Sequence, residues 1–151
     1  MLSALLAIDP GTTHSGWVIM RDGQVWNSGV FANDEVLEMI QVTPVPIAIE
    51  MIASYGMAVG KEVFETCVWI GRFVQAAGAD RVRLVYRKDV KLHLCGSPRA
   101  KDANIRQALI DRWGGKAEAV GTVKKPGPLY GVKSHAWAAL GVAITAMETK
   151  P

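Results

Sequence analysis

Residues 4–20, ALLAIDPGTTHSGWVIM, carry the strongest structural signal in the sequence. The continuous apolar run from Ala4 to Ile8 is typical of a buried central strand. The run stops at Asp9, a Pro-Gly turn follows, and a second apolar run begins at Trp17. We therefore expect two strands here, with a carboxylate at the point where the first strand gives way to its turn.

Patterns in the rest of the chain predict an alternation of strands and helices. Asp22-Gly23 is a hairpin signal that joins the strand at 16–20 to another at 24–31. Asn33 is expected to cap the helix that follows. Two more strands are expected at 46–52 and 82–86, helices at 33–42, 61–77, 101–115 and 134–148, a short helix or turn at 87–96, and a mobile loop rich in Lys, Pro and Gly at 116–133.

This order of elements predicts an α/β class, with a mixed central sheet of about five strands flanked by helices. The RNase H-like fold requires such an order, and several other mixed sheets also satisfy it. With 151 residues and no internal repeat, the chain is expected to form a single domain over residues 1–151.

The composition is that of an ordinary globular protein, with 50% hydrophobic and 21% charged residues, which argues against disorder. The net charge of +3 is compatible with a polyanionic partner but is not diagnostic of one. Cys67 and Cys95 do not suggest a disulfide framework or a zinc site. The longest apolar stretch, residues 136–147, is too short to span a bilayer. We therefore expect a cytoplasmic protein with no membrane partner.

Asp9 and Glu50 both lie at the ends of strongly apolar strands. An ionised carboxylate in such a place is costly unless a cation or several donors compensate it. If the two strands are neighbours, both acids converge and can keep their charge by sharing a divalent metal ion, as in a magnesium-dependent phosphodiester hydrolase. The alternative is structural: Asp9 caps the Pro-Gly turn, and Glu50 pairs with a lysine.

Four motifs, in order across residues 4–147, resemble those of RuvC-type Holliday-junction resolvases. They are DPGTTHSGW (9–17), AIEMIAS (48–54), RAKDANIRQALIDRWG (99–114) and SHAWAALGVAITA (134–146). The stretch SYGMAVGKEVFETCVWIGRF (54–73) is more similar to phage-encoded members than to bacterial housekeeping ones, which would place the protein in a bacterial host cell.

The resemblance implies an RNase H-like fold and a homodimeric crossover junction endodeoxyribonuclease that cleaves Holliday junctions by two-metal hydrolysis. The expected cofactor is Mg²⁺, and the products would carry 5′-phosphate and 3′-hydroxyl ends. Carried over onto this sequence, Asp9 would bridge both metal ions and Glu50 would hold one of them.

The last motif departs from the family's pattern, which usually places two metal ligands three residues apart on the closing helix. Here those positions are His135 and Ala138, and alanine cannot ligate a metal. Asp9, Glu50 and His135 are the expected catalytic residues and metal ligands, and the imidazole makes Mn²⁺ a possible substitute for Mg²⁺. His135 is alternatively a general acid or base, a capping residue or a core-facing residue. Asp102 is a possible substitute ligand, although its place at a helix start favours an N-cap.

DNA would be held by residues around this site. The resemblance implies that the loop after Glu50 inserts Tyr55 or Met57 into the opened junction, where the side chain would stack; packing of these residues onto their own loop is the alternative. Basic residues near the motifs suit phosphate contacts, although a solvated basic face is the alternative for each taken singly. The predicted DNA-binding residues are Tyr55, Met57, Arg99, Lys101, Lys124, Lys125 and Lys133, and Arg87, Lys88 and Lys91 could extend the surface.

The helix at 61–77 carries apolar residues over more than one face. One face can cover the sheet, and the remainder would be left in water unless a second copy buries it. We therefore expect a homodimer through this helix; burial on both sides within one chain is the alternative.

Three other functions compete with the junction nuclease. IDPGTTHSG (8–16) also resembles the phosphate loop of the actin, sugar-kinase and heat-shock ATPase superfamily, but 151 residues cannot hold the two lobes that those proteins need. A catalytically impaired protein of the same fold, which binds branched DNA without cutting it, is made plausible by Ala138. A related nuclease for RNA or for simpler branches such as flaps is the third.

Overall fold

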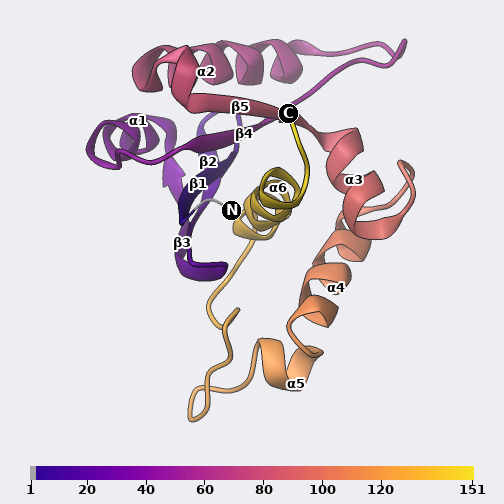
Figure 1. Cartoon of the computed structure of the whole chain (residues 1–151). Coiled ribbons are helices and arrows are strands. Elements are labelled where there is room, and N and C mark those ends of the chain that lie inside the picture. The colour runs from indigo at the N-terminus through magenta and orange to yellow at the C-terminus, as the bar shows by residue number, and fades with distance from the viewer. Residues whose placement is uncertain (1–2) are drawn as a thin grey trace.

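The computed structural model, which describes residues 3–151, has a mixed five-stranded sheet between two layers of helices (Figure 1). Its elements are β1 (Ala4–Asp9), β2 (His14–Arg21), β3 (Gln24–Ala32), α1 (Asn33–Val42), β4 (Ile47–Met51), α2 (Lys61–Ala77), the 3₁₀ turn η1 (Ala79–Arg81), β5 (Val82–Tyr86), α3 (Arg87–Cys95), α4 (Asp102–Arg112), α5 (Lys116–Ala119) and α6 (Ala136–Glu148). The strand order is β3-β2-β1-β4-β5. β1 pairs antiparallel with β2 and parallel with β4, and β4 pairs parallel with β5.

β1 lies at the centre of the sheet, and its successive side chains point to opposite faces. Leu5 and Ala7 pack into one core, whereas Leu6 and Ile8 pack into the other, and all four are buried. The continuous apolar run that opens the sequence therefore reflects burial on both faces of the sheet.

Each face of the sheet has its own layer of helices. α1 and α2 cover one face through Ile40, Ile70 and Phe73. α6 covers the other face and is apolar nearly all round, because α3 and α4 pack against its outer side. A Cβ on Gly141 of α6 would lie 3.2 Å from Val90, so this glycine permits the close approach of α3. Neither α6 nor any other helix within residues 3–151 is long and apolar enough to cross a membrane.

The hairpin predicted at Asp22-Gly23 is confirmed. Both residues have positive φ angles, 50° and 78°, which a two-residue type I′ turn requires. The predicted α/β class and the mixed sheet of five strands are confirmed as well. Residues 116–133 differ from the irregular loop that was expected, because they contain α5 and a backbone bridge between Gly121 and Pro126.

Asn33 does not cap α1 as predicted. Ala32 holds the N-cap position, and its backbone N–H donates to the carboxylate of Glu35 at 3.2 Å. The Asn33 side chain is instead buried, where it accepts a 2.6 Å hydrogen bond from Ser15 Oγ and donates one of 2.9 Å to the Gly11 carbonyl. The Asn33 side chain therefore bonds to residues distant in the sequence and not to its own helix. These bonds hold the turn after β1 against the start of α1.

Candidate active site

Asp9 and Glu50 lie side by side at the carboxyl ends of β1 and β4. The strands are parallel neighbours with Ile8 opposite Ile49, so the residue that follows on each strand reaches the same edge of the sheet. Only 8% of Asp9 and 4% of Glu50 is exposed. Both residues line a pocket of about 540 Å³. The convergence of carboxylates that the sequence suggested is therefore present in the structure.

Burial raises the pKa of both carboxyl groups. For Glu50, the loss of hydration and then the negative charge of Asp9 raise the pKa from 4.5 to about 7, against the pull of Arg87. For Asp9, burial raises the pKa, while the positive charges of His135 and Arg87 oppose the rise. Two acids in this environment would be stabilised by any cation that can reach them.

His135 lies on the solvent side of Asp9. Its Nδ1 is 3.1 Å from Oδ2 of Asp9, and 69% of its side chain is exposed. It holds the N-cap position of α6 but makes no capping hydrogen bond through its side chain. The capping and core-facing alternatives for His135 are therefore wrong, and the imidazole stands beside the carboxylate.

Gly16 allows His135 to reach Asp9. It pairs with Asp9 across β1 and β2, and a Cβ built on it would lie 2.3 Å from the carbonyl oxygen of His135. A side chain at this position would push the segment before α6 away from the strand. The glycine of the first motif therefore provides the space in which the last motif approaches the first.

Arg87 joins Glu50 to Asp102. Its Nη1 lies 3.2 Å from Oε1 of Glu50, and its Nη2 forms an ion pair with the Asp102 carboxylate. Arg87 is the first residue of α3, directly after β5, which is the parallel neighbour of β4. The partner of Glu50 is thus an arginine and not a lysine. The sequence suggested only an outer DNA surface for Arg87, although its place immediately after a strand was a signal for this edge.

Asp102 belongs to the same site and does not cap α4. Lys101 holds the N-cap position, and its backbone N–H donates to Oδ1 of Asn104 at 2.9 Å. The cap predicted for Asp102 is therefore wrong, because Asp102 is the first residue of the helix and Lys101 holds the N-cap position. The carboxylate of Asp102 pairs with Arg87, and its charge helps to raise the pKa values of Asp9 and Glu50.

The side chains around the pocket include the kinds of ligand that a divalent metal ion needs, because carboxylate oxygens and imidazole bind Mg²⁺ or Mn²⁺. As the side chains stand, residues 3–151 contain no group of three His, Cys, Asp or Glu placed to hold an ion. Arg87 lies against Glu50, and Asp9 with His135 is the pair of donors already in contact. Ala138, at the family's fourth ligand position, lines the pocket without offering a donor.

The loop after β4 presents Tyr55 and Met57 to solvent, with 56% and 75% of each residue exposed. Tyr55 lies in a tight turn with φ of 48°, and the Lys88 ammonium is 5.6 Å from the centre of its ring. Tyr55, Lys88 and Lys91 line a second pocket that shares Arg87 with the carboxylate pocket. An aromatic ring and several positive charges are therefore continuous with the acidic centre.

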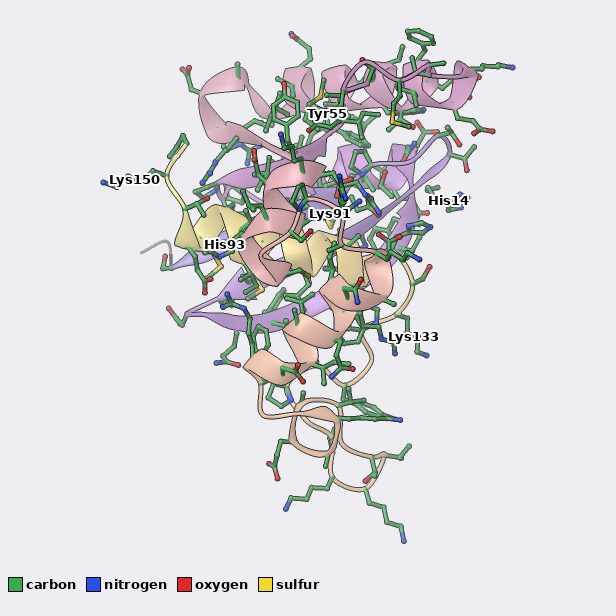
Figure 2. The ribbon with its side chains drawn as sticks, turned by 90° about the vertical axis from the view of Figure 1, so that its right-hand side faces the viewer. His14, Tyr55, Lys91, His93, Lys133 and Lys150 are labelled. Carbon is green, nitrogen blue, oxygen red and sulfur yellow. The ribbon has the colours of Figure 1, made fainter. Side chains whose placement is uncertain are left out.

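The basic residues predicted to contact DNA are exposed, and none of them lines the carboxylate pocket. Lys133 lies two residues before His135, and Figure 2 shows it on the same side of the molecule as His14, the first residue of β2. Lys124 and Lys125 lie between α5 and α6, in the segment that extends away from the sheet in Figure 1. The full set is Arg99, Lys101, Lys124, Lys125 and Lys133.

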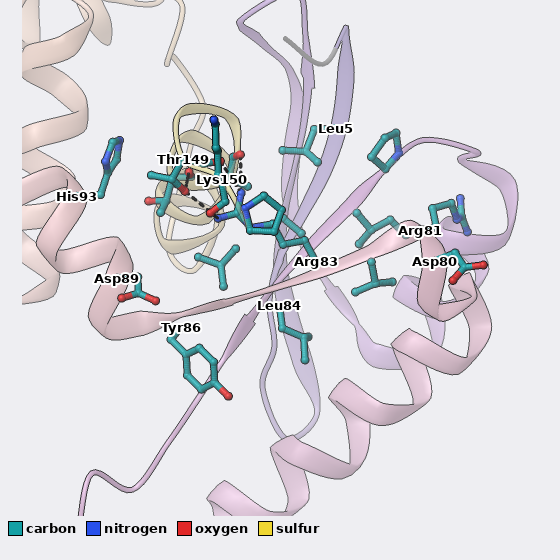
Figure 3. A pocket seen from close by; sticks show the side chains of 18 of the residues that line it. Leu5, Asp80, Arg81, Arg83, Leu84, Tyr86, Asp89, His93, Thr149 and Lys150 are labelled. Carbon is teal, nitrogen blue, oxygen red and sulfur yellow. Dashed lines mark hydrogen bonds between the residues drawn. The ribbon is translucent and has the colours of Figure 1, made fainter.

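A cavity of about 1040 Å³ lies along β5 and the end of α6 (Figure 3). There Arg83 donates to the carbonyl oxygens of Ala146, Thr149 and Lys150. These bonds satisfy carbonyls that a helix C-terminus leaves unpaired. The cavity thus has a structural explanation, and none of the predicted site residues lines it.

The raised pKa of Glu50 makes the stability of the metal-free protein depend on pH. Folding raises this pKa from 4.5 to about 7, so the folded state binds the proton more tightly and the free energy of unfolding falls as the pH rises across that range. A rise of this size corresponds to roughly 3 kcal/mol. We expect Glu50→Gln to remove most of this decrease, and urea unfolding in EDTA at pH 5 and pH 8 measures it.

Glu38→Gln, the same change at an exposed position of α1, is the control and should keep the wild-type pH dependence. An equal decrease in Glu50→Gln and the wild type would contradict the role given to Glu50.

Gly16→Ala should separate His135 from Asp9, because the added Cβ would overlap the His135 backbone. We expect a loss of about 1–3 kcal/mol in the free energy of unfolding, as for overpacking in a core. The His135 ring resonances in an NMR spectrum should respond to Asp9→Asn in the wild type but not in the Gly16→Ala background. Gly60→Ala, where a Cβ meets open space, is the matched control. A full response in Gly16→Ala would show that the glycine does not position His135.

Two solved structures are similar to this chain over nearly its whole length. One is "Thermus thermophilus RuvC structure", with a TM-score of 0.63 and 18% identity, over 95% of this chain and 93% of that one. The other is "T. thermophilus RuvC in complex with Holliday junction substrate", with a TM-score of 0.66 and 20% identity, over 96% and 93%. No protein-family model and no curated protein matches the sequence. The chain therefore has the fold of RuvC, an RNase H-like fold, and the resemblance seen in its motifs is confirmed for the fold.

Proposed function

We propose that this protein is a metal-dependent endonuclease that cleaves branched DNA, with the Holliday junction as its substrate. The observation that carries the proposal is the pair of buried carboxylates, Asp9 and Glu50, at the carboxyl ends of adjacent parallel strands. The same fold occurs in T. thermophilus RuvC, which was solved with a Holliday junction substrate. Hydrolysis would leave 5′-phosphate and 3′-hydroxyl ends.

The site suits a polyanion that must approach an acidic centre. Lys88, Lys91 and Arg87 line the pocket that adjoins the carboxylates. Positive charges of this kind bind phosphates without reading sequence, so they would hold the branch rather than choose its bases. Tyr55, exposed in the neighbouring loop, offers a face on which an unpaired base at the branch point could stack.

Asp9, Glu50 and His135 would hold the metal, with Asp102 as a substitute ligand. Mg²⁺ or Mn²⁺, when bound, would supply a Lewis acid that activates water and stabilises the leaving 3′ oxygen, a task that two ions share in the mechanism implied by the resemblance. The contact of His135 Nδ1 with Asp9 fixes the orientation of the ring. If His135 instead acts as a general acid or base and does not bind the metal, Nε2 of its largely exposed imidazole is the nitrogen that could exchange a proton with a substrate.

A catalytically impaired branched-DNA-binding protein is the second candidate. The observation in its favour is Ala138, which lines the carboxylate pocket in place of a fourth ligand. In that case the basic and aromatic residues would keep their role, while the carboxylates would not support turnover.

We further propose a homodimer formed through α2. Phe64 and Val68, four residues apart on this helix, are each 63% exposed, whereas Ile70 and Phe73 are buried against the sheet. Paired copies of the apolar face would remove it from water. A two-fold dimer would also place two sites on the two strands of a symmetric junction. A phage origin and a place in the cytoplasm of a bacterial host belong to this proposal.

Cleavage of a labelled four-way junction tests the proposed function. We expect paired nicks in Mg²⁺ or Mn²⁺, little cleavage of linear duplex, and a loss of at least 100-fold in rate for Asp9→Asn, because a ligand is removed. Asp34→Asn, the same change at an exposed position of α1, should cleave as the wild type does. Tight junction binding without cleavage in either metal would favour the impaired protein instead.

Val68→Glu tests the dimer, because a charge on the exposed face of α2 opposes its burial. Sedimentation equilibrium should give twice the 16.3 kDa chain mass for the wild type and a shift toward the single-chain mass for the variant. Val42→Glu, the same change at a residue that is 78% exposed on α1, should remain dimeric. A wild type at the single-chain mass would contradict the dimer.

A further inference from the structure

We propose that the guanidinium of Arg87 fills the place of one of the two cations implied by the resemblance, so that each chain binds a single divalent ion. The inference rests on the proposed function, since it concerns how many metal ions the same site holds. It assigns to Arg87 the role of a positioning residue that fixes two carboxylates.

The geometry of Arg87 is that of a bridging cation. One end of its guanidinium contacts Glu50 on β4, and the other contacts Asp102 on α4. These carboxylates come from elements far apart in the chain, and no other residue in residues 3–151 forms an ion pair with either of them. The guanidinium is planar and always charged, and its donors match two carboxylates at once.

The charges of the site balance with one divalent ion. Asp9, Glu50 and Asp102, when ionised, contribute three negative charges and Arg87 contributes one positive charge. Two negative charges therefore remain once His135 binds the ion, because a metal-ligating imidazole is neutral. One divalent ion neutralises that remainder. A second ion would leave two positive charges beside Asp9 and Glu50, which are buried, and uncompensated charge in such a place is costly.

The number of side-chain atoms available as metal ligands also indicates one ion per chain. Oε1 of Glu50 is already committed to Arg87, and Ala138 contributes no ligand. Asp9, the remaining oxygen of Glu50 and His135 are enough for one ion that keeps several waters, as Mg²⁺ does. Two ions would have to share these three donors and the remaining oxygen of Asp102, whose other oxygen contacts Arg87, and the imidazole brings no negative charge to the set.

Counting Mn²⁺ bound to the full chain by equilibrium dialysis tests the inference. We expect one ion per chain in the wild type and two in Arg87→Met, which keeps the length of the side chain but removes its charge. Arg87→Lys should retain one ion, because the positive charge is kept. Arg106→Met is the matched control and should also bind one ion, since Arg106 stacks over the Trp137 ring, 4.9 Å from its centroid, and not on a carboxylate.

Two ions per wild-type chain, or none, would overturn the inference, as would one ion in a folded Arg87→Met protein. If Arg87→Met does not fold, the wild-type count decides alone. The junction assay separates this inference from the proposed function. Cleavage with two ions bound would support the proposed function and reject the role of Arg87. One ion bound without cleavage would support the role of Arg87 and reject the proposed function.

Discussion

The burial of two like charges at one edge of the sheet is the constraint on which the rest of this site depends. β1 and β4 are parallel neighbours in the middle of the sheet, so Asp9 and Glu50, near their carboxyl ends, cannot move apart without breaking the pairing of the strands. Nearly all of each residue is removed from water. Positive charge must therefore come to the carboxylates, and His135, Arg87 and a metal ion are the groups that can bring it.

Much of the surrounding structure positions His135 and Arg87 beside the two carboxylates. Gly16 leaves room for the backbone of His135 beside Asp9, although the two segments are more than a hundred residues apart in sequence. Ser15 and Asn33 hold the turn that follows Asp9, because each bonds to the Gly11 backbone and the two side chains bond to one another. α3 begins at Arg87 directly after β5, which brings the guanidinium to the edge where Glu50 lies. The sheet fixes the acids, and the loops and helix starts around it supply their partners.

The site therefore differs in character from a set of acidic ligands alone. Where the resemblance implies a further metal ligand, Ala138 contributes none, and an arginine with its own acidic partner, Asp102, lies close by. An organic cation held by two carboxylates is permanent, whereas a metal ion exchanges with solvent. According to the proposal, Arg87 permanently neutralises part of the negative charge of the carboxylates, and one exchangeable metal ion neutralises the remainder.

The sequence by itself determined the strands, the helices and the α/β class, because apolar periodicity and turn residues are local properties that survive any arrangement of distant segments. It also pointed to Asp9 and Glu50, since each lies at the end of a strongly apolar strand, and to His135 through the resemblance of the last motif. Only the tertiary structure decided the roles of Asn33, Asp102 and Arg87. Local rules favoured helix caps for the first two, but a short polar side chain at a helix start can bond to its own backbone or to a distant partner. Arg87 meets a residue 37 positions away only because β4 and β5 lie side by side, and that neighbourhood is a property of the folded sheet.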